Sequence, residues 1–232
     1  MSLGRVGIVV AARSGSQRLP GKALLSLGGI PMLPFLLRRL RPARRAALFL
    51  ATTDLPADDV LEGVAMQEGV PVFRGADADV VARYVGAAER FSLDTVVRVT
   101  ADCPFVDAEL VDFCLEQIEL TEAFDLATTK TRFPTGLDAE IYKADAMAKL
   151  HHGGRLDASE REHLTLHYYN HSERYCIRYI DPMESWPTVG RHLMVDTAAD
   201  YAFARRLAAA LPAGDQSIGA VLRTAAGLMV AG

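Results

Sequence analysis

The sequence predicts an α/β fold in which a doubly wound, mostly parallel sheet carries helices on both faces. Apolar runs without strict alternation recur along the first half of the chain, as in strands buried on both sides. Amphipathic helical segments separate these runs, and short connections imply right-handed βαβ crossovers. The expected strands, of which the fifth is the weakest, are Val6–Ala12, Ala46–Thr52, Val70–Phe73, Thr95–Thr100 and Asp125–Thr128.

Three helices are expected between these strands. Residues 31–40 begin with a proline, which a first helical turn accepts. Residues 56–69 have acidic residues early and a glycine at the end, the usual polarity of helix signals. Residues 79–91 place their apolar side chains on one stripe at helical spacing.

The alternation changes after about residue 129. Residues 130–190 are interpreted as a small inserted α+β segment of a single domain spanning 1–232. It is expected to hold a strand at the end of "KTRFPTGLDAEIYK", a helix near 160–169 and another strand in "RYCIRYI". Residues 191–211 then return to the α/β domain as a strand, an aspartate and a helix, and the patterned tail predicts a last helix.

Composition excludes several classes of protein. The chain has 232 residues, a formal net charge of −4 and no apolar run near the ~20 residues of a membrane span, so neither a nucleic-acid binder nor a membrane protein is expected. The basic run at 38–45 is interpreted as a solvated helix end. Three scattered cysteines and no visible secretory signal favour the cytoplasm.

The loop at residues 11–22 leaves the first strand where open α/β sheets bind ligands. It carries Arg13, Arg18 and Lys22 beside two glycines, and several cationic donors together suit a polyphosphate. The spacing does not fit the two most familiar phosphate loops, since the glycines are too far apart for a Walker A motif and G-x-G-x-x-G is absent. A surface turn with incidental arginines is the alternative.

The stretch "ARSGSQRLPGKALLSLGGIPML" resembles the N-terminal signature of the sugar-activating cytidylyltransferases, which include the CMP-acylneuraminate and CMP-Kdo synthetases. The subgroup of spore coat polysaccharide biosynthesis proteins is the most similar. The resemblance covers most of residues 5–207 and continues, in order, through "VFRGADADVVARY", "VVRVTADCPFVD", "FPTGLDAEIY", "EREHLT" and "MVDTAADY".

This resemblance implies a nucleotide-diphospho-sugar transferase (Rossmann-like) fold and a homodimer. It also implies that CMP passes from CTP to a sugar or sugar-acid hydroxyl with Mg²⁺ present and pyrophosphate released, in surface or coat polysaccharide biosynthesis. By resemblance, the residues that hold the triphosphate are Arg13, Ser14, Gly15, Ser16, Arg18 and Lys22. Arg74 and Gly75 would contact the base, although a salt bridge from Arg74 to Asp77 or Asp79 is an equal alternative.

Arg13, Lys22 and Asp102 are the expected catalytic residues. The resemblance makes Asp102 and Asp196 the Mg²⁺ ligands, and carboxylates with phosphate oxygens are the usual ligands of that ion. Asp102 could instead form a turn before Pro104, and Asp196 could be the N-cap of a helix. Alanines at 198 and 199 replace the Pro-Glu of the family pattern.

The acceptor side is expected to include Arg98 and Thr100 on the fourth strand and several residues of the inserted segment. The full set is Arg98, Thr100, Gly136, Asp138, Glu140, Glu162 and His163. Lys130 and Arg132 could bind a carboxylate or phosphate of the sugar. Ordinary loop polarity is the alternative for each residue of the inserted segment.

Three rival functions remain open. His163, His167 and His171 recur every four residues and would share a helix face, which raises a metal-dependent hydrolase, although the glutamate of H-E-x-x-H is missing. A non-catalytic nucleotide-binding subunit is a second possibility. A nucleotidyltransferase that uses another nucleoside triphosphate with a sugar phosphate is the third.

Overall fold

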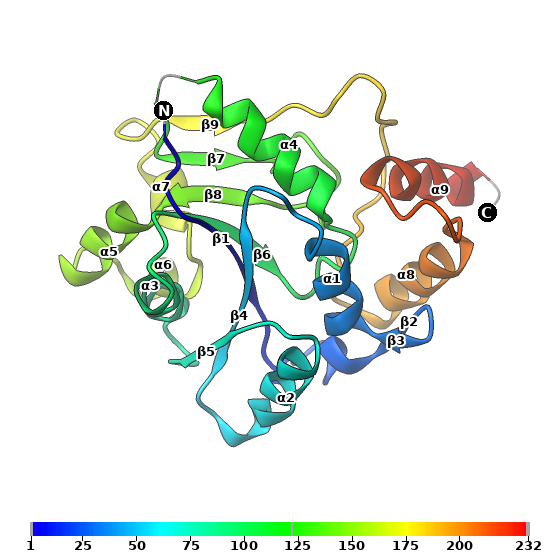
Figure 1. Ribbon diagram of the computed structural model, residues 1–232, viewed down its shortest axis with the longest axis horizontal. Helices are drawn as coiled ribbons and strands as arrows, with labels where there is room; N and C mark the ends of the chain where they lie inside the picture. The colour runs from blue at the N-terminus through cyan, green and yellow to red at the C-terminus, as the bar shows by residue number, and fades with distance from the viewer. Residues whose placement is uncertain (1, 122, 231–232) are drawn as a thin grey trace.

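A seven-stranded sheet lies at the centre of the molecule (Figure 1). The computed structural model describes residues 2–121 and 123–230. Across the sheet the order is β5 (Val72–Gly75), β4 (Ala47–Thr53), β1 (Val6–Ala11), β6 (Thr95–Thr100), β8 (Glu140–Lys143), β7 (Leu126–Thr128) and β9 (Ile177–Tyr179). The first four strands run parallel, whereas β8 is antiparallel to both of its neighbours. All five strands expected from the sequence are therefore present.

Helices cover both faces of the sheet, as predicted. One face packs against α1 (Met32–Leu40), α2 (Asp59–Gln67), α4 (Ala108–Glu119), α8 (Ala198–Ala210) and α9 (Ile218–Val230). The other packs against α3 (Val80–Arg90), α5 (Ala144–His152), α6 (Ala158–Glu162) and α7 (Leu166–Asn170), which gather to the left in Figure 1. None of the helices in the described part of the chain is long and apolar enough to cross a membrane.

Strand β1 shows why its apolar run does not alternate with polar residues. Ile8 and Val10 are fully buried in the core on the α1 side, and Val9 between them is fully buried in the core on the α3 side. A strand with helices on both faces needs apolar side chains in both directions, so the continuous run and the two-layer helical cover have one cause.

The segment 130–190 forms both of its expected strands, which are β8 and β9 and belong to the central sheet. Its expected single helix is two short helices, because His163 leaves the helical conformation at φ −110° and ψ 84°. The expected strand at 191–195 is also absent: these residues bond to loops, with Leu193 N–H donating to Thr135 O at 2.6 Å and Val195 N–H to Asp102 O at 2.8 Å.

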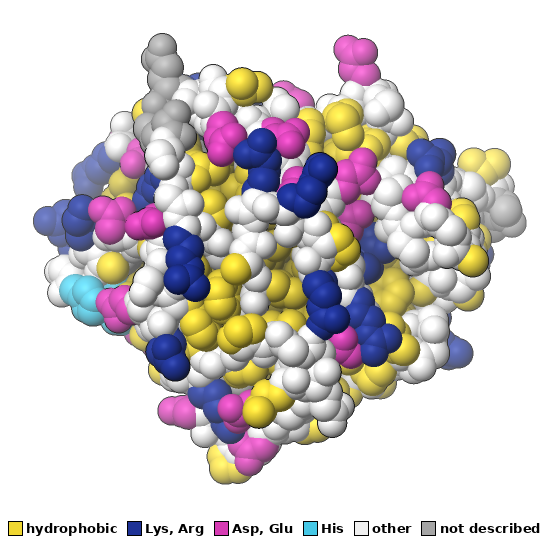
Figure 2. All heavy atoms as spheres, viewed as in Figure 1, with side chains coloured by type: hydrophobic (Ala, Val, Ile, Leu, Met, Phe, Trp, Pro, Cys, Tyr) yellow, Lys and Arg dark blue, Asp and Glu magenta, His cyan; other side chains and the backbone are white. Residues whose placement is uncertain are grey.

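The basic run at 38–45 is not simply solvated, and for Arg39 that interpretation is wrong. Arg39 is buried, donates to Gln216 O at 2.6 Å and lies 3.5 Å from Asp107. Arg38 forms an ion pair with Glu68 at 2.7 Å, so α1 uses its cations to contact neighbouring elements. Figure 2 shows Lys and Arg side chains dispersed among Asp and Glu over one face of the molecule.

Candidate active site

Lys22 lies at the centre of the candidate site. It opens the short 3-10 helix η1 (Lys22–Leu24) directly after Gly21, whose φ of +64° favours glycine. Its Nζ donates to Asp102 Oδ2 and to Asp196 Oδ1, both at 2.8 Å, and to Val195 O at 3.1 Å. The structure thus brings together the lysine and the two carboxylates that the sequence singled out.

The sheet explains half of this convergence. Strands β1 and β6 are parallel neighbours, so the loop with Lys22 and the turn with Asp102 leave the same edge. Beyond the strands, Ala101 N–H still donates to Ala11 O at 2.9 Å. The Val195–Asp102 backbone bond then places the residue after Val195, Asp196, beside that turn.

A close backbone contact fixes the segment that carries Asp196. Gly136 has a φ of +100°, and a Cβ on it would lie 2.2 Å from the Met194 backbone nitrogen. Only glycine fits this approach, so Gly136 holds the 130–137 loop against residues 193–194. Its predicted role on the acceptor side remains a prediction, whereas its packing role is visible here.

Asp196 is not the N-cap of the following helix. Thr197 caps α8, since its hydroxyl accepts from Asp200 N–H and the Asp200 side chain accepts from Thr197 N–H. This capping box supplies the helix start despite the alanines at 198 and 199. The Asp196 carboxylate is therefore available to Lys22 and to Arg18, whose Nη2 lies 2.7 Å from Asp196 Oδ2.

The charges at this centre stabilise one another. Burial lowers the pKa of Lys22, but Asp102 and Asp196 outweigh that effect and the pKa is raised. Burial likewise works to raise the pKa of Asp102, and the neighbouring ammonium outweighs it, so that the pKa is lowered. Near neutral pH the group holds an ammonium between two carboxylates, and such oxygens are the ligands that Mg²⁺ prefers. The two side chains fit a magnesium site.

Asp58 anchors the start of the loop, and sequence reasoning missed it. Its Oδ1 accepts from Ser14 N–H at 2.7 Å and from the Ser14 hydroxyl, while its Oδ2 accepts from the Thr53 hydroxyl. Asp58 is buried, at 2% exposure, so this carboxylate is structural. The sequence showed it only as one of the acidic residues typical of a helix start.

The rest of the loop is open to solvent. Arg18 is 70% exposed on its side chain, and Arg13 makes only a 3.4 Å pair with Asp77. A Cβ at Gly15 would meet nothing within 4 Å, so the backbone there leaves space for a ligand. Ser16 N–H turns inward to Ser14 O at 2.8 Å. Arg18 thus joins the Lys22 group through Asp196, whereas Arg13 pairs with Asp77.

Arg74 connects β5 to the segment after β4. It donates to Thr53 O at 2.9 Å and lies 2.6 Å from Asp59 and 2.9 Å from Glu62. The expected alternative partners, Asp77 and Asp79, lie elsewhere: Asp79 caps α3 and pairs with Arg161 at 2.9 Å. The neighbouring Gly75 packs under the Phe73 ring, and a Cβ on Gly75 would lie 2.8 Å from Phe73 Cε1. Contact of Arg74 and Gly75 with a base stays a prediction.

Glu140 lies at the centre of the residues expected on the acceptor side, as a buried anion. It pairs with Arg98, and its Oε1 lies 3.0 Å from Lys130 Nζ, 2.7 Å from the Thr165 hydroxyl and 2.8 Å from the Tyr169 hydroxyl. Burial works to raise the pKa of Glu140, and Arg98 and Lys130 bring it down to about 2. The side chain of Glu140 is fully buried, so its effect on a ligand would be to hold Arg98 and Lys130, whose side chains are 22% and 36% exposed.

The other expected acceptor residues are dispersed. Thr100 Oγ1 lies 3.4 Å from Cys103 Sγ, and Asp138 accepts from Gly136 N–H at 3.0 Å, with burial raising its pKa. Glu162 and His163 are exposed at the end of α6. Arg132 pairs with Asp181 at 3.4 Å, apart from Lys130 and Glu140. Thr165 and Tyr169 complete the Glu140 group; Thr165 ends the motif "EREHLT" but was not singled out, and Tyr169 lies outside the motifs.

Comparison with known proteins assigns the family. Residues 7–218 match the profile of the cytidylyltransferase family. The chain belongs to this enzyme family. It is 33% identical over 198 residues to the spore coat polysaccharide biosynthesis protein SpsF of Bacillus subtilis, covering 83% of this chain and 82% of SpsF. It is 37% identical over 124 residues to a 3-deoxy-manno-octulosonate cytidylyltransferase of Methylococcus capsulatus, covering 52% and 48% of the two chains.

The solved structures agree with this assignment. A cytidylyltransferase from Leptospira borgpetersenii superposes with a TM-score of 0.89 and 28% identity, over 98% of this chain and 96% of that one. The expected nucleotidyltransferase-type fold, Rossmann-like and mostly parallel, is therefore confirmed for this cytidylyltransferase.

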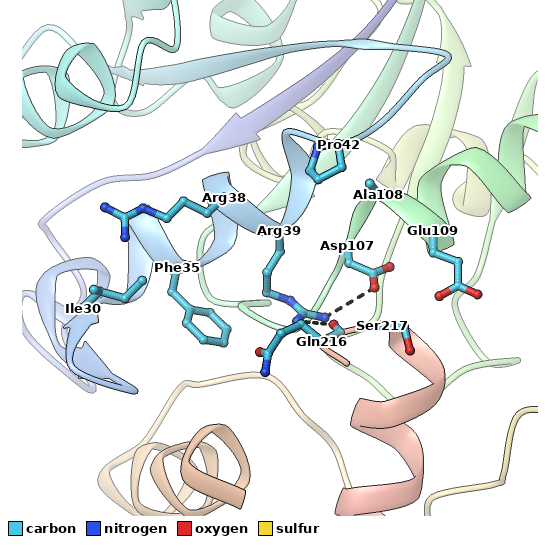
Figure 3. Close-up of a pocket in the computed structure, with 10 residues that line it drawn as sticks. All are labelled: Ile30, Phe35, Arg38, Arg39, Pro42, Asp107, Ala108, Glu109, Gln216 and Ser217. Carbon is cyan, nitrogen blue, oxygen red and sulfur yellow. Dashed lines mark hydrogen bonds and ion pairs between the residues drawn. The ribbon is translucent and has the colours of Figure 1, made fainter. Parts of the chain in front are cut away.

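The cytidylyltransferase has a further cavity of about 440 Å³ between α1, the start of α4 and the segment before α9 (Figure 3). Figure 3 shows the guanidinium of Arg39 and the carboxylate of Asp107 pointing toward each other there. The lining residues are Ile30, Phe35, Arg38, Arg39, Pro42, Asp107, Ala108, Glu109, Gln216 and Ser217. None of the site residues predicted from the sequence lines it.

Proposed function

We propose that this enzyme transfers CMP from CTP to a hydroxyl of a sugar acid and releases pyrophosphate. The observation that carries the proposal is the Lys22 ammonium between Asp102 and Asp196, with Arg18 paired to Asp196 and the exposed Arg13 on the same loop at the carboxyl edge of the sheet. SpsF and the 3-deoxy-manno-octulosonate cytidylyltransferase, as relatives, support a sugar acceptor and a role in surface or coat polysaccharide biosynthesis.

The loop would bind the triphosphate. In this transfer an acceptor oxygen bonds to the α-phosphorus while the bond from that phosphorus to the departing pyrophosphate oxygen breaks, and negative charge grows on the leaving group. Lys22 and the two arginines would supply positive charge for those oxygens. The Ser14–Asp58 anchor holds the loop in place, so little reorganisation is needed during the reaction.

Asp102 and Asp196 would hold a magnesium ion. Both carboxylates already face one cationic atom, the Nζ of Lys22, at 2.8 Å. When bound, the ion would neutralise charge on the phosphate oxygens of the nucleotide. The Lys22 ammonium would then turn from the two carboxylates to the triphosphate, which carries more negative charge.

The acceptor would lie beside Arg98 and Lys130. These two cations share one carboxylate, Glu140, so the group keeps a net positive charge and a partly exposed face. A carboxylate on the acceptor sugar matches that charge. We also propose that residues 130–190 bind the acceptor and form the interface of a homodimer. The three free cysteine thiols support a cytoplasmic location, where thiols stay reduced.

Pyrophosphate release tests the proposal. CTP, UTP, GTP and ATP are each combined with a panel of sugar acids and sugar phosphates, with Mg²⁺ present. We expect turnover with CTP and a sugar acid, and Lys22→Met should lower kcat/KM about 10²–10³-fold because a transition-state donor is lost. Lys149→Met is the control, since Lys149 is 77% exposed and pairs only with Asp145 on its own helix.

Either of two results would contradict the proposal as a whole, and a third would contradict the choice of nucleotide. One is the absence of both CTP binding and turnover with every CTP pairing. The other is equal loss of activity in the Lys22 and Lys149 variants. Preference for a different nucleoside triphosphate would overturn the assignment of CTP in this chain.

A further inference from the structure

Three side chains that could bind a metal ion meet between α6 and α7, outside the site described above. His167 Nδ1 lies 3.0 Å from Glu160 Oε2, and His171 Nε2 lies 3.7 Å from Glu160 Oε1. One potential ligand atom from each residue falls within 4.8 Å of the other two. The set differs from the three-histidine face expected from the sequence, because Glu160 takes part and His163 does not.

The spacing of these atoms suits a small tetrahedral ion. Ligand atoms at about 2.0–2.2 Å from a tetrahedral zinc lie about 3.3–3.6 Å from each other. The two imidazoles approach different oxygens of Glu160, at 3.0 and 3.7 Å, and one ligand atom from each of the three residues lies within 4.8 Å of the other two, so side-chain movements of about an ångström would complete the geometry. Two imidazoles with one carboxylate favour zinc over magnesium or calcium, which take oxygen ligands.

The surrounding residues orient two of the three ligands, His167 and Glu160. His167 Nε2 lies 3.2 Å from the Tyr175 hydroxyl, which leaves Nδ1 facing Glu160. Asn170 Nδ2 donates to Glu160 Oε1 at 3.1 Å. Hydrogen bonds of this kind fix the ring orientation of metal-binding histidines. Glu160 and His167 are 5% and 10% exposed, and His171 is 35% exposed, which gives an ion access from solvent.

We propose that Glu160, His167 and His171 bind one zinc ion that fastens α6 to α7. Both helices have only five residues, too few to be stable alone. The connection between them carries Thr165, and α7 carries Tyr169, the two hydroxyls that bond to Glu140. Zinc bound here would hold the acceptor side of the enzyme in shape without entering the reaction.

Metal titration tests this directly. Protein stripped with a chelator is titrated with Zn²⁺ against a chromophoric competitor, and bound zinc is counted by mass spectrometry. We expect one zinc per chain in the wild type and at least a tenfold weaker Kd in His171→Ala and in Glu160→Gln. The glutamine can still complete the capping box of α6, so this second variant guards against a folding defect.

The control is His152→Ala. The side chain of His152, on α5, is 62% exposed, and its Nε2 lies 3.3 Å from Glu89 Oε1 on the neighbouring helix α3. Its zinc affinity should equal that of the wild type. Zinc should also raise the Tm of the wild type and of this control, but not that of His171→Ala. Absence of saturable zinc binding by the wild type, or equal affinity in all four proteins, would show a purely hydrogen-bonded cluster and overturn the proposal. These readouts do not depend on the transfer reaction.

Discussion

Lys22 contacts two carboxylates that lie 80 and 174 residues away from it in the sequence. The identity of all three residues could be predicted from the motifs that contain them. Their convergence could not, because it depends on the pairing of β1 with β6 and on the backbone bond between Val195 and Asp102. The sequence thus shows which side chains carry charge, and the topology of the sheet decides which of them form ion pairs.

At the residue scale, Asp58→Ala should loosen the loop that precedes Lys22. The substitution leaves Ser14 N–H and the Thr53 hydroxyl without their acceptor, and we expect about 2–3 kcal/mol less free energy of unfolding. KM for CTP should rise about tenfold. Urea denaturation and steady-state kinetics measure the two effects.

Asp54→Ala is the matched control, since Asp54 is exposed on the same connection. A change within about 0.5 kcal/mol is expected there. If both variants were equally stable, Asp58 would not be the anchor of the loop.

At the element scale, two contacts outside regular secondary structure position the carboxylate of Asp196. The Thr197 capping box defines where α8 begins, and Gly136 fixes the extended segment before it. An expected strand at 191–195 is replaced by loop contacts, yet the aspartate still reaches the edge of the sheet. Asp196 is therefore positioned by backbone contacts of the segment before it, whereas Asp102 is positioned by strand β6.

Gly136→Ala should therefore displace the segment that carries Asp196. Its φ of +100° is strained for alanine, and the new Cβ would lie 2.2 Å from the Met194 backbone nitrogen. We expect a loss of about 3 kcal/mol or more in the free energy of unfolding and a weaker CTP-dependent rise in Tm. Chemical denaturation and thermal melts with CTP measure both.

Gly154→Ala separates the two causes. Gly154 has a φ of +63°, but a Cβ there would meet nothing within 4 Å. A cost of about 1 kcal/mol is expected from the backbone alone. Equal destabilisation by the two substitutions would mean that the Met194 contact contributes nothing.

At the scale of the whole molecule, stability should fall in acid because of Glu140. Its pKa is lowered from 4.5 to about 2, so its contribution is complete above pH 4.5 and is lost as the pH falls toward 2. This amounts to about 3 kcal/mol at most. Denaturant melts from pH 7 to pH 2 should show the loss, and Glu140→Gln should have a shallower pH dependence in that range.

Asp107 provides a contrast of opposite sign. Burial raises its pKa from 3.8 to about 6 against the opposing effect of Arg39, so its contribution favours the folded state in acid and is lost as the pH rises from about 4 to 6. Asp107→Asn should remove that pH dependence while asparagine still caps α4. A Glu140→Gln protein with the wild-type acid profile would exclude Glu140 as the source of the loss below pH 4.5.

The sequence by itself determined the local properties of this protein. Apolar runs predicted five strands, because burial on both faces of a sheet demands continuous apolar residues, and helical stripes predicted three of the helices between them but not α4. The motifs singled out Lys22, Asp102 and Asp196, whose side chains are of the types expected to bind a triphosphate and its metal ion.

Only the tertiary structure decided the contacts made at long range. It paired Arg74 with Asp59 and Glu62 rather than with its near neighbours in the sequence. It divided the helix expected at 160–169 and brought Glu160 to His167 and His171. Such partners are set by which segments the sheet brings side by side, and periodicity within one segment carries no information about the other.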